Sequence, residues 1–258
     1  MAHKARKRFG QNFLQDHNII YNILVNIQPQ PDEHWVEIGP GLGAITEPLI
    51  QENIILDVIE LDRDLVQYLT NKFSAKKNLT IHSADALNFN FSKLSNQDKK
   101  LRIIGNLPYN ISTPLLFHLL NNAFCIEDMH FMLQKEVVDR ICAEPGSKKY
   151  GRLSVMMQYY CEAESLFDVP AESFNPIPKV NSAIIRLIPH QIPPVNIASI
   201  EKLNKIVTTA FSQRRKTIRN SLKTIISEQR IVDLEINPEL RAESISLFEF
   251  AKLSHFVE

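Results

Sequence analysis

Short apolar runs recur along the first 190 residues, and each is bounded by glycine, proline or polar residues. Such runs predict β-strands. Apolar residues at helical spacing lie between them, as in Ile19, Ile23 and Ile27 ahead of the first run and in Leu65 and Leu69 after the second. Strands that alternate with helices predict a doubly wound, mostly parallel sheet of the Rossmann-like α/β class. The predicted strands cover residues 35–38, 54–60, 79–82, 101–105, 129–133, 162–169 and 182–188.

Polar residues mark where several of the predicted helices begin. Asp16 and Asp62 each precede a helical pattern, and a carboxylate at that position accepts hydrogen bonds from the first backbone N–H groups. Ser112, Thr113 and Pro114 form another helix start, shortly after the fourth strand. The fourth strand therefore passes into a helix through a short loop.

The C-terminal part of the chain has a different pattern. Pro189, Pro193 and Pro194 predict a linker, because closely spaced prolines sustain neither a helix nor a strand. Beyond the linker, apolar residues recur at helical spacing alone. We therefore expect an α/β domain over residues 1–190 and a small all-helical domain over residues 196–258. The helical positions are Ile200, Leu203, Ile206, Val207 and Ala210, then Ile218, Leu222, Ile225 and Ile226.

The composition excludes several classes of protein. Hydrophobic residues make up 44% of the 258 residues, which is enough for a sizeable core, but no apolar run approaches the ~20 residues that cross a bilayer. Three cysteines without a CxxC pair and eight scattered histidines give neither a disulfide framework nor metal-ligand spacing. The basic N-terminus lacks the apolar core of a signal peptide. We expect a cytoplasmic protein with no membrane segment and no metal.

Charge is distributed unevenly although the formal net charge is zero. The segment 202–223 contains seven basic residues and no acidic residue, whereas the segment that follows is acidic. Phosphates within a Debye length respond to such a local patch and not to the net charge. The patch favours a nucleic-acid partner, and a solvated helix face is the alternative.

A glycine turn follows the first predicted strand. Gly39 and Gly41 allow backbone N–H groups to approach a ligand closely, and Glu60, at the end of the second strand, can accept hydrogen bonds from both hydroxyls of a ribose. Gly39, Gly41 and Ala44 also satisfy the dinucleotide fingerprint. An NAD-dependent oxidoreductase is therefore one interpretation of these residues.

Two further strands end in polar side chains. Asp85 follows the third strand and Asn106 ends the fourth, so both should lie on the same edge of the sheet as Glu60. A nicotinamide site does not require them, whereas a nucleoside bound across the edge would, with Asp85 accepting from an adenine amine. The alternative for Asp85 is a helix cap.

The stretch from Asn106 to Tyr109 could hold a flat base. Asn106 offers a donor and an acceptor, Pro108 fixes a backbone dihedral, and Tyr109 supplies a stacking surface. A tight turn with a core tyrosine is the other interpretation of these four residues, since asparagine, proline and tyrosine are common where strands meet loops.

Together with other motifs, this stretch resembles the ribosomal RNA adenine N6-dimethyltransferases. The similarity extends in order from about Phe9 to Lys216, and is greatest to the bacterial small-subunit branch, whose loss gives resistance to kasugamycin. The motifs that carry it are Phe9-Gly10-Gln11-Asn12-Phe13-Leu14, Glu37-Ile38-Gly39-Pro40-Gly41, Asn106-Leu107-Pro108-Tyr109-Asn110-Ile111-Ser112, Gln134-Lys135-Glu136, Phe174-Asn175-Pro176-Ile177-Pro178-Lys179-Val180 and Phe211-Ser212-Gln213-Arg214-Arg215-Lys216.

The resemblance implies S-adenosylmethionine as the cofactor, lying along the sheet edge. In the family, positions that match Glu60 and Asp85 hold the ribose and the adenine amine, and Asn106 lies beside the reacting end. The other cofactor positions implied are Asn12, Leu14, Gly39 and Gly41.

The resemblance also suggests how an adenine acceptor would be held. The Asn106 oxygen and a backbone carbonyl near Leu107 and Pro108 would accept the N6 hydrogens, which favours a pyramidal nitrogen aimed at the methyl group. The base must leave its stack to reach this point. We expect Tyr109 on one face of the base and Phe174 on the other, with Phe174 exposed in its proline-rich loop and a core role as its alternative.

The basic patch is expected to bind ribosomal RNA. Arg214, Arg215, Lys216, Arg219 and Lys223 would form a stripe on one helix that contacts phosphates, together with the basic residues between Lys4 and Arg8.

The expected activity is dimethylation of N6 on two adjacent adenines in the 3′-terminal hairpin loop of small-subunit rRNA. We expect a monomer that acts on a pre-assembled small ribosomal subunit. A large-subunit rRNA methyltransferase that confers macrolide resistance and a non-catalytic ribosome-assembly factor are the alternatives.

Overall fold

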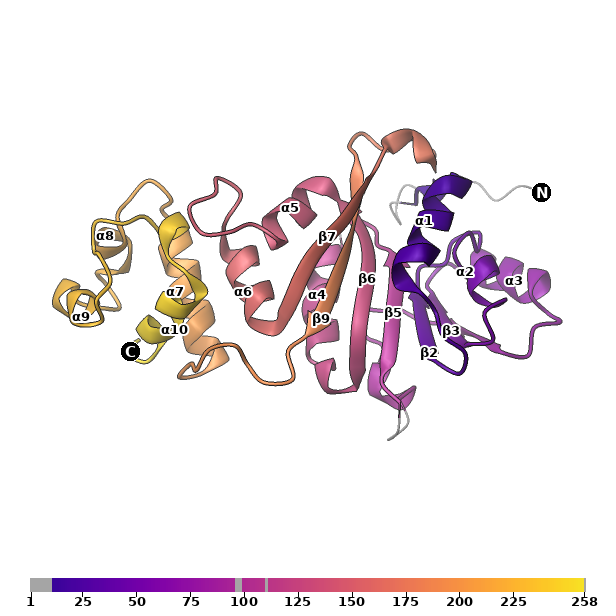
Figure 1. Ribbon diagram of the computed structural model, residues 1–258, viewed down its shortest axis with the longest axis horizontal. Helices are drawn as coiled ribbons and strands as arrows, with labels where there is room; N and C mark the ends of the chain where they lie inside the picture. Colours follow the sequence, from indigo (N-terminus) through magenta and orange to yellow (C-terminus); the bar gives the residue numbers. More distant parts are fainter. Residues whose placement is uncertain (1–10, 96–98, 110, 258) are drawn as a thin grey trace. The chain divides into compact units, whose positions relative to one another are not determined.

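A seven-stranded sheet forms the centre of the fold (Figure 1). The computed structural model describes residues 11–95, 99–109 and 111–257. The strand order is β4-β3-β2-β5-β6-β9-β7; β2 to β6 pair in parallel, and β9 runs antiparallel to β6. This arrangement confirms the predicted doubly wound sheet. The strands are β2 (His34–Ile38), β3 (Ile55–Glu60), β4 (Leu79–Ser83), β5 (Leu101–Asn106), β6 (Ile126–Gln134), β7 (Cys161–Val169) and β9 (Ser182–Pro189).

A second, two-stranded sheet was not predicted. Its strands β1 (Phe13–Leu14) and β8 (Phe174–Asn175) pair antiparallel. Each strand has only two residues, too few for a periodic pattern to indicate. The pairing joins the start of the described chain to the loop ahead of β9.

The helices begin largely at the positions that the polar residues predicted for their starts. The carboxylates of Asp16 and Asp62 cap the helices that follow them, α1 and α3, by accepting from backbone N–H groups of Asn18 and Asp64. Among the described residues, no helix has the length and hydrophobicity that a bilayer span requires. The helices in the first part of the chain are α1 (His17–Ile27), α2 (Thr46–Leu49), α3 (Arg63–Lys72) and α4 (Ser112–Leu120), with 3₁₀ turns at Phe91–Lys93, Ala123–Cys125 and Ala171–Ser173.

Two helices in the middle of the chain were missed. These are α5 (Lys135–Ile141) and α6 (Arg152–Tyr160), which lie between the fifth and sixth predicted strands. The later helices are α7 (Ile200–Phe211), α8 (Ile218–Leu222), α9 (Glu228–Asp233) and α10 (Leu247–Ser254), with a 3₁₀ turn at Ala242–Ser244.

The chain divides into two compact units. One contains the chain up to Val138 together with Glu164–Pro189, and the other contains Asp139–Ala163 together with the chain from His190 onward. The boundary expected near residue 190 coincides with one crossing between the units. The expected ranges of 1–190 and 196–258 differ from these units in the segment Asp139–Ala163, because α6 packs with α7 and α10.

The main core of the first unit lies on one face of the sheet. Apolar residues of α1, α2 and α3 form a single cluster with the side chains that this face of β2 and β3 presents. Trp35, Leu56 and Val58 are fully buried in it. Burial of this kind contributes ~25 cal/mol of stabilising free energy per Å² of apolar surface. It therefore holds β2 and β3 in place, and with them the residues at their carboxyl ends.

A buried carboxylate links three strands on the opposite face. Asp57 on β3 accepts hydrogen bonds from His34 on β2, at 2.6 Å, and from His82 on β4, at 2.5 Å. Burial by itself raises the pKa of the Asp57 carboxyl, but the two histidines outweigh this effect and hold its pKa below the usual value. Asp57 is therefore ionised in the folded protein at neutral pH.

We predict that this arrangement stabilises the fold in a pH-dependent manner. A carboxyl whose pKa is lowered by folding stabilises the protein above its unfolded pKa of ~3.9, and the contribution is lost as the pH falls through the folded value. Asp57→Asn should lower the free energy of unfolding at pH 7 by ~1–3 kcal/mol. The variant should also lose less of its free energy of unfolding than the unchanged protein does as the pH falls.

Urea denaturation of Asp57→Asn and of the unchanged protein, from pH 7 down to pH 3, measures the difference in their free energies of unfolding. Asp64→Asn, which changes an exposed carboxylate at the start of α3, is the control. Equal stability of Asp57→Asn and the unchanged protein at pH 7 would contradict the prediction.

Candidate active site

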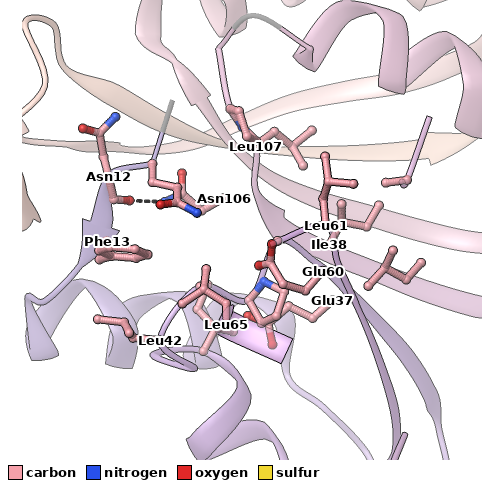
Figure 2. A pocket seen from close by; sticks show the side chains of 18 of the residues that line it. Asn12, Phe13, Glu37, Ile38, Leu42, Glu60, Leu61, Leu65, Asn106 and Leu107 are labelled. Carbon is pink, nitrogen blue, oxygen red and sulfur yellow. Dashed lines mark hydrogen bonds between the residues drawn. The ribbon is translucent and has the colours of Figure 1, made fainter. Parts of the chain in front are cut away.

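A cavity of about 350 Å³ opens at the carboxyl ends of β2, β3 and β5. The strand order reverses between β2 and β5, and open α/β sheets bind their ligands at such a point. The lining is largely apolar, with polar side chains from several strand ends, and its volume lies within the ~300–1,000 Å³ typical of ligand sites. Figure 2 shows Glu60 and Asn106 directed toward the same space.

The glycine turn after β2 lines the cavity. Gly39 and Gly41 have φ values of 69° and 58°, a region that side chains with a Cβ rarely occupy. A Cβ added to Gly41 would lie 3.0 Å from the Phe13 ring. The absence of that atom lets Phe13, on β1, cover the turn.

Glu60 is buried at the end of β3, with 7% of its surface exposed. Its Oε1 accepts from the backbone N–H of Asp62 at 2.8 Å. Burial raises the pKa of Glu60, and hydrogen bonds from backbone N–H groups of Asp62, Gly41 and Leu61 oppose that increase. A carboxylate has about four acceptor positions, so this geometry leaves capacity for ribose hydroxyls.

Glu37 is a second buried carboxyl in the cavity, and its sequence motif alone predicted no role for it. Burial raises its pKa to about 7, the hydrogen bond from Thr46 at 2.6 Å opposes this, and the charge of Glu60 adds to the increase. One feature of the sequence could have indicated this role: Glu37 is a charged residue between two apolar neighbours, Val36 and Ile38, in a predicted strand.

Asp85 lies in the turn after β4 and lines the cavity. Its Oδ1 accepts from the backbone N–H of Leu87 and its Oδ2 from the Asn88 side chain, both at 2.9 Å. The carboxylate therefore orders its own turn, and among the described residues no helix begins there for it to cap. Its remaining lone pairs are available to an adenine amine.

The Asn106 amide is oriented by the N-terminal segment. Its Nδ2 donates to the backbone carbonyl of Asn12 at 3.0 Å, as Figure 2 shows. Within the described parts of the chain, Oδ1 of Asn106 has no hydrogen-bond partner. The amide thus presents its oxygen, an acceptor, to whatever occupies the cavity.

The residues after Asn106 continue the cavity wall. Residues 106–109, which we call the acceptor loop, all line the cavity. The Leu107 backbone N–H donates to Met132 on β6 at 3.2 Å, and the Tyr109 hydroxyl is 3.0 Å from the Ser182 hydroxyl. Tyr109 is only half-buried, so the core-tyrosine interpretation does not describe it.

Phe174 does not lie where the sequence analysis placed it. Only 3% of its surface is exposed, and it belongs to the main core cluster with Leu14, its partner in the β1–β8 pair. Successive strand residues point to opposite sides, so the pairing directs Phe174 inward and Asn175 outward. The expectation of an exposed Phe174 ring is therefore wrong, and this ring does not line the cavity.

The cavity brings together the other predicted site residues. The roles assigned to them remain predictions, but their positions agree with one shared site. They are Asn12, Leu14, Gly39, Gly41, Glu60 and Asp85, with Asn106, Leu107, Pro108 and Tyr109. The basic residues Lys4, Arg6, Lys7 and Arg8, and the motif residues Phe9, Gly10 and Asn110, lie outside the described residues.

The basic residues of the second unit do not form a helical stripe. Arg214, Arg215 and Lys216 lie in the turn between α7 and α8, Arg219 is in α8, and Lys223 follows it. The sequence pattern suggested a continuous helix, but Thr217 interrupts it by bridging to Arg241.

Acidic residues distant in sequence neutralise part of this basic group. Arg214 lies 3.5 Å from Glu243 and donates to the Lys148 carbonyl, and Arg219 pairs with Glu228 and Glu239. Arg215, Lys216 and Lys223 are exposed and, among the described residues, have no ion pair.

Comparison with known proteins identifies the family. The model of the family described as ribosomal RNA adenine dimethylase matches residues 2–258. The chain belongs to the ribosomal RNA adenine dimethylase family. Proteins named ribosomal RNA small subunit methyltransferase A from a Marinomonas species and from Saccharophagus degradans are 52% and 54% identical to it. The alignments cover 99% and 98% of this chain and 96% and 95% of theirs.

Solved structures confirm the expected Rossmann-like fold of this dimethylase. A dimethyladenosine transferase from Plasmodium falciparum superposes with a TM-score of 0.79 at 22% identity, covering 93% of this chain and 95% of that one. The 23S rRNA methyltransferase ErmE superposes with a TM-score of 0.73 at 25% identity, covering 95% and 99%.

The cofactor of this dimethylase is S-adenosylmethionine, and the cavity fits it. Glu60 places a buried carboxylate in the cavity, a group that can accept hydrogen bonds from ribose hydroxyls, and the apolar side chains of Ile38 and Leu61 also line it. The two buried carboxyls, Glu37 and Glu60, suit a ligand that carries net positive charge. The nicotinamide interpretation of the glycine turn is set aside, because family and fold both indicate a methyltransferase.

We predict that cofactor affinity rises with pH around neutrality. Because the pKa of Glu37 is about 7 in the free protein, a cationic cofactor favours its ionised form and binds more tightly as that form becomes populated. Isothermal titration from pH 6 to pH 8 should show this increase, and Glu37→Gln should abolish it. The same pH dependence in Glu37→Gln would assign it to another group.

Proposed function

We propose that this chain transfers methyl groups from S-adenosylmethionine to N6 of two adjacent adenines in small-subunit rRNA. The observation that carries the proposal is the orientation of the Asn106 amide, whose Nδ2 is held by the Asn12 carbonyl so that Oδ1 faces the cavity. An amide oxygen at this point accepts a hydrogen from an exocyclic amine. Adenine N6 carries amine hydrogens that can be donated in this hydrogen bond, whereas an adenine ring nitrogen or a ribose carbon has no amine hydrogen to donate.

The acceptor loop supplies the remaining groups for the reaction. The lone pair of adenine N6 is delocalised into the ring, so the amine is a weak nucleophile while it stays planar. Acceptance of its hydrogens by Asn106 Oδ1 and by a carbonyl of the acceptor loop would favour the pyramidal form, with the lone pair directed at the methyl carbon. Bound S-adenosylmethionine supplies an electrophilic methyl group with a neutral thioether as leaving group.

No side chain of high pKa is needed to remove the proton. Once N6 is methylated the nitrogen is a strong acid, and its proton passes to water. Tyr109 would replace part of the stacking that the base loses when it leaves the RNA, which is worth ~1–3 kcal/mol per base. The ring and Asn106 both line the cavity, so one base could use both.

Sequence similarity supports the small subunit as the target. The relatives at 52% and 54% identity carry the small-subunit name, whereas ErmE, a 23S rRNA methyltransferase, is 25% identical. We propose that a monomer acts on a pre-assembled small subunit, in the cytoplasm where subunits mature. The intact acceptor loop favours an active enzyme over a non-catalytic assembly factor.

The decisive experiment offers labelled S-adenosylmethionine with unmethylated small or large ribosomal subunits. Digestion of the RNA should release labelled dimethyladenosine from the small subunit. Label in the large subunit alone would favour the macrolide-resistance alternative. Binding to the small subunit without any transfer would favour the assembly factor.

We predict that Asn106→Ala and Tyr109→Ala retain cofactor binding but lose methyl transfer. Each change removes a group that we propose holds the acceptor base, so the rate of transfer should fall by ~10²–10⁴-fold while the cofactor dissociation constant changes little. Single-turnover transfer and calorimetric cofactor binding measure the two quantities.

Glu60→Ala is the converse variant for this prediction. It removes the proposed ribose carboxylate, so it should weaken cofactor binding measurably at an unchanged rate of transfer when the cofactor is saturating. Full transfer activity in both acceptor-loop variants would remove that loop from the mechanism.

We also predict that the exposed cations of the second unit contribute unequally to RNA binding. Arg215→Glu and Lys216→Glu should weaken binding to small subunits and reduce its salt dependence, because their charges are available to phosphates. Arg214→Ala should weaken binding less than Arg215→Ala does, since Glu243 already compensates the charge of Arg214. Filter binding at several salt concentrations measures both effects.

Lys77→Glu is the matched control, because Lys77 is an exposed lysine in the first unit. It makes the same change in net charge at a different place. Equal losses in Lys77→Glu and Arg215→Glu would indicate a general charge effect and no specific phosphate site.

A further inference from the structure

The Tyr109 hydroxyl is bonded to a residue far away in sequence. Its oxygen lies 3.0 Å from the hydroxyl of Ser182, the first residue of β9. Ser182 is completely buried, and Tyr109 is its only side-chain partner within the described residues. The bond therefore joins the acceptor loop to a strand on the far side of β6.

This bond fixes the position of the Tyr109 ring. The loop backbone is already anchored, since Leu107 N–H donates to Met132 and the Tyr109 carbonyl accepts from the Ser112 hydroxyl at 3.2 Å. The ring itself still has two rotatable bonds, and the hydroxyl is the atom farthest from the backbone. The hydroxyl oxygen lies on the axis of the second rotation, so a hydrogen bond at that atom restricts the first rotation, the swing of the whole ring about the Cα–Cβ bond. A ring stacks on a base only when it lies over the base.

The position of the ring matters more for the second methyl transfer than for the first. Adenine N6 has two hydrogens, one for Asn106 Oδ1 and one for the loop carbonyl. In each transfer the N6 lone pair forms the new N–C bond, the C–S bond electrons remain with sulfur, and one N6 proton leaves to water. Monomethyladenine therefore retains a single hydrogen and makes only one of these two hydrogen bonds.

We infer that Ser182 is a positioning residue that acts through the Tyr109 hydroxyl to hold the monomethylated base for the second transfer. The inference rests on the proposed function and deepens it. Because the monomethylated base keeps only one hydrogen bond through N6, the stacked ring is the main remaining restraint on its position. A ring that is free to swing would then permit the first transfer and impair the second.

The test uses the full chain with Ser182→Ala, labelled S-adenosylmethionine and unmethylated small subunits. Monomethyladenosine and dimethyladenosine are quantified over time after digestion of the RNA. The second transfer should slow by about five-fold, as expected for loss of one neutral hydrogen bond, while the first changes by less than about two-fold. Monomethyladenosine should accumulate, and the cofactor dissociation constant should stay unchanged.

Tyr109→Phe tests the same bond without altering β9. It keeps the ring and removes the hydroxyl, so it should reproduce the Ser182→Ala product ratio, and the double variant should be no worse than either single one. Ser221→Ala removes a buried hydroxyl from the second unit and should behave as the unchanged protein.

Two results would overturn the inference. One is a product ratio like that of the unchanged protein in both Ser182→Ala and Tyr109→Phe. The other is a double variant whose losses add, which would show that the hydroxyls act separately. If the unchanged protein itself forms no dimethyladenosine on small subunits, the proposed function fails as well, so the two failures are distinguishable.

Discussion

The parallel pairing of β2 with β5 is the constraint on which the active site depends. Its register places Ile38 opposite Gly105, so the next residues, Gly39 and Asn106, lie side by side where the two strands end. A Cβ on Gly39 would lie only 3.7 Å from the Asn106 carbonyl oxygen. The glycine turn of the cofactor site and the acceptor loop are thus adjacent because of strand pairing alone, before any side chain contributes.

Buried charge distinguishes the two ends of the sheet. At the carboxyl end, Glu37 and Glu60 are both buried, burial raises the pKa of each, and the site is suited to a cation. Toward the amino end, Asp57 has histidines on either side and its pKa is lowered. A buried carboxyl group is therefore suited to binding a cation at one end and to stabilising the fold at the other, according to whether positive partners lie within reach.

The short β1–β8 pair connects the glycine turn of the cofactor site with the acceptor loop. β1 carries Phe13, which covers the glycine turn, and follows Asn12, whose carbonyl orients the Asn106 amide. β8 begins the loop that leads to Ser182, the partner of Tyr109. The glycine turn, the Asn106 amide and the Tyr109 ring therefore each contact a segment that this pair brings together within the first unit.

The sequence alone determined the parallel strands, the capped helices and the strand ends that carry Glu60, Asp85 and Asn106, because these depend on periodicity and local capping. Tertiary structure decided what depends on partners distant in sequence. The β1–β8 pair buried Phe174, Glu243 compensated Arg214, and the elevated pKa of Glu37 arose from its burial. The environment of a side chain is set by segments that fold against it, and no local pattern encodes them.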